Sequence, residues 1–205
     1  MPSKIKAVGF DFSGVIELYP PGRLLTTIAE LFHIPLEKFQ TEYFKQNYLS
    51  HVQNQNFADV MVKVASTFSD DRQTEEKIKN IIKERQNKSR LNTELISWFS
   101  ILKEKGFKVG ILSNYTTDLT EKLKKWDIYD LVDTVVVSSE IGFQKPDKEA
   151  FTILFERLGV LPKETIFIDD ANKSLEKAEE IGYHPILFKD NEHLKKDLQD
   201  FGIEL

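Results

Sequence analysis

The sequence predicts an α/β protein with a doubly wound parallel sheet, interrupted early in the chain by a long helical segment. Short runs such as residues 109–112 and 165–168 are apolar throughout, which is typical of parallel strands covered by helices on both faces. Each run follows an amphipathic segment that ends at a glycine, as helices commonly do. Repeated helix–strand units of this kind favour a parallel sheet between two layers of helices.

The first strand is expected at residues 7–10, and three helix–strand units fill the second half of the chain. They span residues 92–114, 147–170 and 172–189, with Gly106, Gly159 and Gly182 as their helix stops and with Asp147 as the cap that begins the helix of the second unit. A further strand is expected at 135–137, after a helical stretch at 119–126. The sheet should therefore contain five or six strands in a Rossmann-like arrangement.

Residues 18–88 have helical periodicity and almost no strand signal. About 70 residues are far more than a simple connection needs, so we expect a separate helical domain there and an α/β core domain formed by 1–17 and 89–205. The aromatic residues of this insert are expected to form its core: Phe39, Tyr43, Phe44, Tyr48 and Phe57.

Composition excludes several classes of protein. The 205 residues are 40% hydrophobic and 30% charged with a net charge of −5, which indicates a globular chain without the basic surface of a nucleic-acid-binding protein. Lysines such as Lys122, Lys124 and Lys125 alternate with acidic residues and are expected on solvated helix faces. There are no cysteines, so disulfides and thiolate zinc sites are excluded. No apolar run is long enough to cross a membrane, and a cytoplasmic location is expected.

Polar side chains follow three of the predicted strands where each strand ends. Asp11 follows the first, Ser113 and Asn114 follow another, and Asp169 and Asp170 follow a third. Each could be a local turn or helix-capping residue. Because the carboxyl ends of parallel strands form the ligand-binding edge of such sheets, we expect the residues to meet at one site.

The residue types at this edge suit a magnesium-bound phosphoryl group. Mg²⁺ prefers hard oxygen ligands, which Asp11, Asp170 and the carbonyl of Ser13 could provide. The other oxygen of Asp11 could attack phosphorus as a nucleophile. Ser113 could donate a hydrogen bond to phosphate from its hydroxyl, and Asn114 could donate one from its backbone N–H. Lys145 could balance the negative charge.

Four segments resemble, in order and spacing, the motifs of the haloacid dehalogenase-like hydrolase superfamily: 10–15 (FDFSGV), 111–114 (ILSN), 142–147 (GFQKPD) and 167–170 (FIDD). The helical insert is similar to the small helical cap of the branch with phosphoglycolate phosphatase-like enzymes and the phosphatase domain of soluble epoxide hydrolase. The resemblance implies Asp11 as nucleophile and phosphate binding by Ser113 and Lys145. It also implies Mg²⁺ held by Asp11, Ser13 and Asp170, with Asp169 as an outer or water-mediated ligand.

One position departs from that family pattern. Phosphatases of the superfamily usually have a second aspartate two residues after the nucleophile, as the general acid and base, where this chain has Ser13. A hydroxyl is a poor substitute, and general acid–base catalysis is worth about 10²–10⁴-fold. Glu17 follows closely, but it is expected to be a solvated loop residue.

The sequence therefore predicts a magnesium-dependent phosphatase of a small phosphorylated metabolite, acting through an aspartyl-phosphate. The alternative is a catalytically weakened member that binds a phosphorylated ligand or a protein partner. A metal-independent dehalogenase is a third possibility, although dehalogenases of the superfamily have tyrosine where this chain has Ser13.

Overall fold

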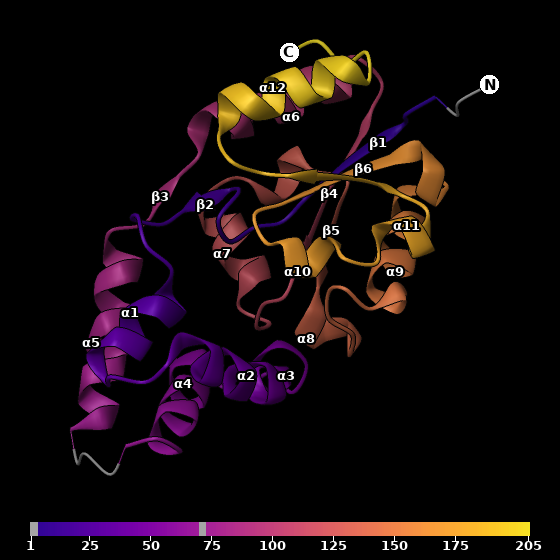
Figure 1. The fold of residues 1–205 in the computed structure, drawn as a ribbon. Coiled ribbons are helices and arrows are strands. Elements are labelled where there is room, and N and C mark those ends of the chain that lie inside the picture. Colours follow the sequence, from indigo (N-terminus) through magenta and orange to yellow (C-terminus); the bar gives the residue numbers. More distant parts are fainter. Residues whose placement is uncertain (1–3, 70–72) are drawn as a thin grey trace.

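The computed structural model describes residues 4–69 and 73–205, and its centre is a parallel five-stranded sheet (Figure 1). The strand order is β5-β4-β1-β6-β7, and each neighbouring pair is parallel. The strands are β1 (Ala7–Phe10), β4 (Lys108–Ser113), β5 (Thr134–Val137), β6 (Thr165–Asp169) and β7 (His184–Leu187). Strands β1 and β6 are buried along their whole length, as their continuous apolar sequences predict. The predicted α/β fold with a doubly wound parallel sheet is confirmed.

Helices cover both faces of the sheet and form two separate hydrophobic clusters with it. On one face, α6 (Thr93–Glu104), α7 (Leu119–Lys125) and α12 (Asn191–Asp200) pack against Val8 and Phe10. On the other face lie α9 (Lys148–Leu158), α10 (Asn172–Leu175) and α11 (Ala178–Ile181). The short helices α8 (Ser138–Ile141), η1 (Tyr129–Leu131) and η2 (Pro162–Glu164) lie in the connections.

Five further helices, α1–α5, lie apart from the sheet, in the lower part of Figure 1. They have a hydrophobic cluster of their own, which includes Ile28, Phe39, Val64 and Ile78. Their bounds are α1 (Leu24–Leu31), α2 (Leu36–Gln46), α3 (Tyr48–His51), α4 (Phe57–Ser66) and α5 (Thr74–Asn87). This separate cluster is consistent with the predicted helical insert. The division of the chain into a core domain and a helical domain at residues 18–88 stays a prediction.

A two-stranded antiparallel ribbon connects these helices to the rest of the chain. It pairs β2 (Glu17–Leu18) with β3 (Arg90–Leu91), and the sequence pattern predicts neither strand. Two residues in each strand are too few to produce an alternating pattern. The ribbon brings the entry and exit of the insert side by side (Figure 1).

Two expected core aromatics of the insert are exposed. Phe39 is fully buried, whereas Phe44 is 48% exposed and Tyr48 is 45% exposed. Consecutive residues on a helix differ by about 100° in direction, so Phe44 points away from the cluster that its neighbour Tyr43 contacts. In the described residues, no helix is both long and apolar enough to span a membrane.

Candidate active site

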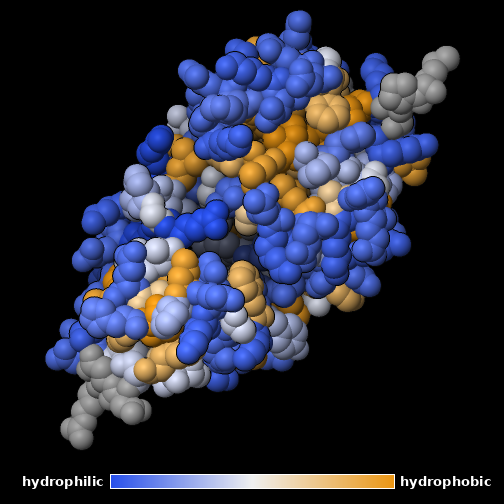
Figure 2. Space-filling view, viewed as in Figure 1, coloured by the Kyte–Doolittle hydropathy of each residue, from blue (hydrophilic) through white to orange (hydrophobic). Residues whose placement is uncertain are grey.

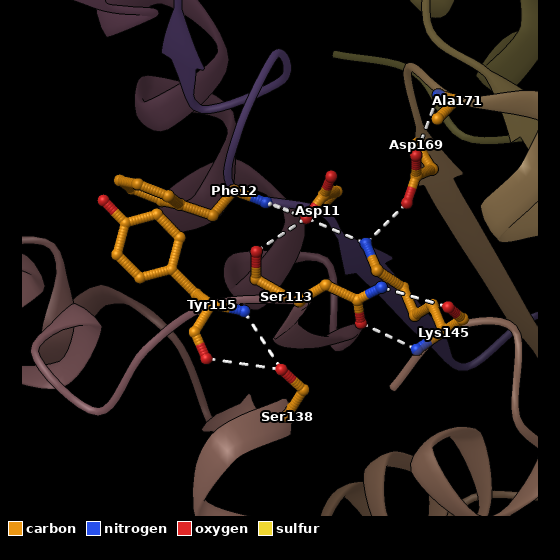
Figure 3. Close-up of polar contacts among 9 residues, drawn as sticks. Asp11, Phe12, Ser113, Tyr115, Ser138, Lys145, Asp169 and Ala171 are labelled. Carbon is orange, nitrogen blue, oxygen red and sulfur yellow. Dashed lines mark hydrogen bonds and ion pairs between the residues drawn. The ribbon is translucent and has the colours of Figure 1, made fainter. Parts of the chain in front are cut away.

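The carboxylate of Asp11 lies at the centre of a polar cluster at the carboxyl edge of the sheet (Figure 3). Its Oδ1 atom accepts hydrogen bonds from the backbone N of Phe12 at 2.7 Å and from the Ser113 hydroxyl at 2.9 Å. The ammonium of Lys145 lies 2.8 Å from the same oxygen. Strands β1 and β4 are neighbours in the sheet. Asp11 and Ser113 therefore meet, because Asp11 follows the end of β1 and Ser113 is the last residue of β4.

Lys145 bridges two carboxylates from different strands. Its Nζ atom is 2.8 Å from Asp11 and 2.5 Å from Asp169, and the whole residue is only 4% exposed. Asp169 ends β6 and also accepts a hydrogen bond from the backbone N of Ala171 at 2.8 Å. A buried ammonium between two carboxylates is held by strong charge-assisted hydrogen bonds.

Asn114 holds the backbone on which Lys145 lies. Its side-chain amide donates to the carbonyl of Lys145 at 3.0 Å and accepts from the backbone N of Lys145 at 2.7 Å. The side chain of this predicted phosphate-binding residue is therefore used to position Lys145. A role in substrate binding would fall to its backbone N–H.

Asp170 lies at the outer side of the same cluster. Carboxylate oxygens of Asp11, Asp169 and Asp170 all lie within 4.8 Å of one another, with Asp11 and Asp169 buried and Asp170 exposed. Ser13 lies in the turn after Asp11 and is half-buried. The structure thus brings together Asp11, Ser113, Lys145, Asp169 and Asp170, with Asn114 and Ser13 beside them.

Charge crowding shifts the pKa values of the cluster. Burial raises the pKa of Asp11, although Lys145 acts against this. Desolvation raises the pKa of Asp169 to about 6. Desolvation, together with the negative charge of Asp169, also raises the pKa of Asp170 to about 6. Burial opposes the charged form of Lys145, but Asp11 and Asp169 outweigh it and raise its pKa. Three carboxylates thus share one ammonium.

A family model for haloacid dehalogenase-like hydrolases matches residues 24–188, which is most of the chain. The chain belongs to this family. Among curated relatives of this haloacid dehalogenase-like hydrolase is a glyceraldehyde 3-phosphate phosphatase of Methanothermobacter thermautotrophicus, 31% identical over 50% of this chain and 49% of the relative. Another is the porcine (Sus scrofa) bifunctional epoxide hydrolase 2, 24% identical over 62% of this chain and 24% of the relative. The matches cover about a quarter to half of these relatives' lengths.

Solved structures share the haloacid dehalogenase-like fold. A HAD family enzyme of Bacteroides thetaiotaomicron has a TM-score of 0.63 and 22% identity, covering 94% of this chain and 98% of that one. The same Bacteroides protein has also been crystallised in complex with magnesium and inorganic phosphate. Its likeness to this chain supports the fold.

The acidic cluster of this haloacid dehalogenase-like hydrolase fits a divalent cation. Three carboxylates within 4.8 Å of one another supply the hard oxygen donors that Mg²⁺ prefers. Desolvation and mutual repulsion raise the pKa values of Asp169 and Asp170, and a bound cation would oppose both effects. Gly14 permits the close approach of Asp170, because a Cβ atom at Gly14 would lie 2.5 Å from the Asp170 carboxylate.

The expectation that Glu17 is a solvated loop residue is wrong. Glu17 is 2% exposed, and its carboxylate accepts hydrogen bonds from Tyr19 at 2.7 Å, Ser89 at 2.8 Å and Lys122 at 2.9 Å. Lys122 is correspondingly not a solvated surface lysine, since its ammonium also lies 4.7 Å from the centre of the Trp126 ring. The sequence does contain one indication that Glu17 is buried, because it lies within the apolar run Val15-Ile16-Glu17-Leu18.

Proposed function

We propose that this chain is a magnesium-dependent phosphatase that acts on a small phosphorylated molecule through an aspartyl-phosphate on Asp11. The observation that carries this proposal is the convergence on Asp11 of the Ser113 hydroxyl and the Lys145 ammonium, beside two further carboxylates. Membership of the hydrolase family and the phosphatase among its relatives support it.

Each residue has a distinct chemical role in this proposal. A carboxylate oxygen of Asp11 attacks phosphorus, and the bond from phosphorus to the leaving-group oxygen breaks. Ser113 and Lys145 already donate to an oxygen of Asp11, so their donors lie where the oxygens of a phosphoryl group next to Asp11 would be bound. Water then hydrolyses the acyl phosphate, which releases inorganic phosphate and regenerates the Asp11 carboxylate.

Asp11, Asp170 and the carbonyl of Ser13 would hold Mg²⁺, with Asp169 as an outer or water-mediated ligand. When bound, Mg²⁺ neutralises negative charge on the phosphoryl oxygens. The requirement for such a cation is supported by the crowding of three carboxylates around one lysine. The complex of the Bacteroides relative with magnesium and phosphate is consistent with this assignment.

The helices α1–α5 would act as a cap over the site, and the ribbon β2–β3 would be its hinge. Figure 2 shows a hollow between the sheet-containing part of the molecule and these helices. Closure of such a cap excludes water from the reacting groups and completes the substrate site. This domain role extends the predicted division at residues 18–88.

A second function is favoured by Ser13. A chain without a carboxyl group two residues after the nucleophile could bind a phosphorylated ligand or a protein partner and turn over slowly. Glu17 does not compensate, because its carboxylate is engaged by Lys122, Tyr19 and Ser89.

The test is hydrolysis of a broad panel of phosphate monoesters at high enzyme concentration, with Mg²⁺ and with a chelator. We expect phosphate release that depends on Mg²⁺ and disappears in Asp11→Asn, which removes the nucleophile but keeps the side-chain size. Binding of phosphate esters without release in the parent protein would favour the second function. Release of halide from haloacids without metal would identify a dehalogenase instead.

A further inference from the structure

Two arginines from the helical insert lie beside the candidate active site. Arg85 is in α5, where its guanidinium donates a hydrogen bond to the carbonyl of Pro20 at 3.2 Å and lies 5.2 Å from the centre of the Tyr19 ring. Arg23 precedes α1 and is exposed. Both residues therefore border the segment 19–23, which leads from the ribbon into the helices.

This segment lies close to the carboxylate of Asp170. Gly14 faces the Asp170 carboxylate, and its backbone N donates a hydrogen bond to the carbonyl of Glu17 at 2.8 Å. Tyr19, against which Arg85 packs, interacts through its hydroxyl with Glu17, four residues after Ser13. The segment that holds Arg23 and contacts Arg85 therefore continues directly from the turn beside Asp170, and the charge of Asp170 interacts with both arginines.

Neither arginine has its charge neutralised by a close carboxylate. Within residues 4–69 and 73–205, no salt bridge involves Arg23 or Arg85, and the one hydrogen bond from the Arg85 side chain goes to a neutral carbonyl. A guanidinium group has five N–H donors, so most of those on both residues remain available. The contact with the Tyr19 ring and the hydrogen bond to Pro20 hold the Arg85 guanidinium in place, which reduces the entropy cost of binding.

We propose that Arg23 and Arg85 bind a second anionic group of the substrate, so that the preferred substrates are small phosphate monoesters that also carry a carboxylate or a second phosphate. This inference rests on the proposed function and specifies its substrate class. The scissile phosphoryl group occupies the place between Ser113 and Lys145, and the distal anion extends toward the insert. A planar fork of N–H donors suits either anion.

The position of the arginines explains why they do not compete for the scissile phosphoryl group. Lys145 reaches Asp11 from the core side and is buried between two carboxylates. Arg23 and Arg85 belong to the other part of the molecule, where Arg23 precedes α1 and Arg85 lies in α5. A molecule with anionic groups at both ends would contact both parts, and its binding would favour cap closure.

The experiment compares n-propyl phosphate with two analogues that carry a terminal carboxylate or a terminal phosphate, 3-(phosphonooxy)propanoate and propane-1,3-diyl bisphosphate. We expect kcat/KM of the parent to be about tenfold higher for at least one charged analogue than for propyl phosphate, as charge-assisted hydrogen bonds allow. This ratio should fall several-fold in Arg23→Gln and approach one in the double variant with Arg85→Gln. Arg23→Lys should retain part of this ratio, because the charge is kept and the planar fork of donors is lost. Added salt should lower the ratio.

Arg90→Gln is the matched control, because it removes the same charge from an exposed position in β3, and it should keep the parental ratio. Equal kcat/KM for all three compounds in the parent would overturn the inference and leave the proposed function standing. A ratio that survives in the double variant would also overturn it. Failure of the parent to hydrolyse any of the three or any ester of the wider panel would overturn both the inference and the proposed function.

Discussion

At the scale of single residues, Ser13 has the largest consequence for catalysis. It lies in the turn between Asp11 and Glu17, where the backbone N of Gly14 donates to the carbonyl of Glu17 at 2.8 Å. Its hydroxyl is a much weaker acid than a carboxyl group near neutral pH, so departure of an alkoxide lacks assistance from this position. The proposed enzyme should therefore be slow with poor leaving groups.

Ser13→Asp should raise kcat for alkyl phosphates by about 10²–10⁴-fold, because it restores general acid–base catalysis. The gain should be smaller for p-nitrophenyl phosphate, whose leaving group needs no proton. Steady-state kinetics with both substrates and saturating Mg²⁺ measure the difference, and Ser13→Asn is the control of equal size without a carboxyl group. An unchanged kcat for alkyl phosphates in Ser13→Asp would contradict the assignment of this position.

Sequence patterns were sufficient to place Asp11, Ser113 and Asp169 near one another, because the ends of adjacent parallel strands lie at one edge of a sheet. The partners of Glu17 could not be identified in this way, although the apolar run around it hints at burial. Its partners Ser89 and Lys122 are 72 and 105 residues away in the chain, and no local pattern reports such a pairing. The same limit explains why Arg85 was not recognised as a neighbour of the site.

At the scale of secondary-structure elements, strand register and one tight turn determine where the carboxylates lie. Phe10 pairs with Ile168, so the residues that follow, Asp11 and Asp169, emerge side by side. The turn after β1 then requires Gly14, which has a φ of +90° and faces the carboxylate of Asp170. A residue with a side chain would there both strain the backbone and displace a proposed metal ligand.

Gly14→Ala and Gly106→Ala separate these two effects. Gly106 also has a left-handed φ, of +86°, but an added Cβ atom would meet no other atom within 4 Å. Both variants should lose about 1–2 kcal/mol of stability from backbone strain. Only Gly14→Ala should also weaken Mg²⁺ binding, because the new Cβ would overlap the Asp170 carboxylate.

Urea unfolding measures the stability of the two variants, and calorimetric titration with Mg²⁺ measures the affinity. Parental Mg²⁺ affinity in Gly14→Ala would contradict the proposed role of Asp170 as a ligand.

At the scale of the whole molecule, two groups of hydrogen bonds among the described residues join the insert to the sheet-containing part. One lies at the ribbon, where Glu17 is bound by Ser89 at the end of the insert and by Lys122 of α7. The other lies around α3, where Ser138 of α8 donates a hydrogen bond to the carbonyl of His51. After α3, Asn54 exchanges hydrogen bonds at 2.9 and 3.1 Å with Thr117, which lies between β4 and α7. Cap opening would preserve the first contact and break the second.

The His51 contact should make this closed arrangement sensitive to acid. The Nδ1 atom of His51 is buried without a hydrogen-bond partner. Burial, and to a smaller extent the charge of Lys145, lowers the pKa of His51 to about 4, despite an opposing contact with Gln144. Because the unfolded chain binds the proton more tightly, stability from this group is fully present above about pH 6.5 and is lost as the pH falls from there toward 4.

The size of this effect can be isolated by comparing the parent with His51→Gln. Between pH 7.5 and pH 5, the parent should lose about 2 kcal/mol more stability than the variant, which has no imidazole to protonate. Urea unfolding of both proteins at the two pH values gives this difference, in which the contributions of all carboxylates cancel. Equal losses of stability in the two proteins would mean that the folded protein does not hold His51 neutral. The contact between α3 and α8 would then not be sensitive to acid.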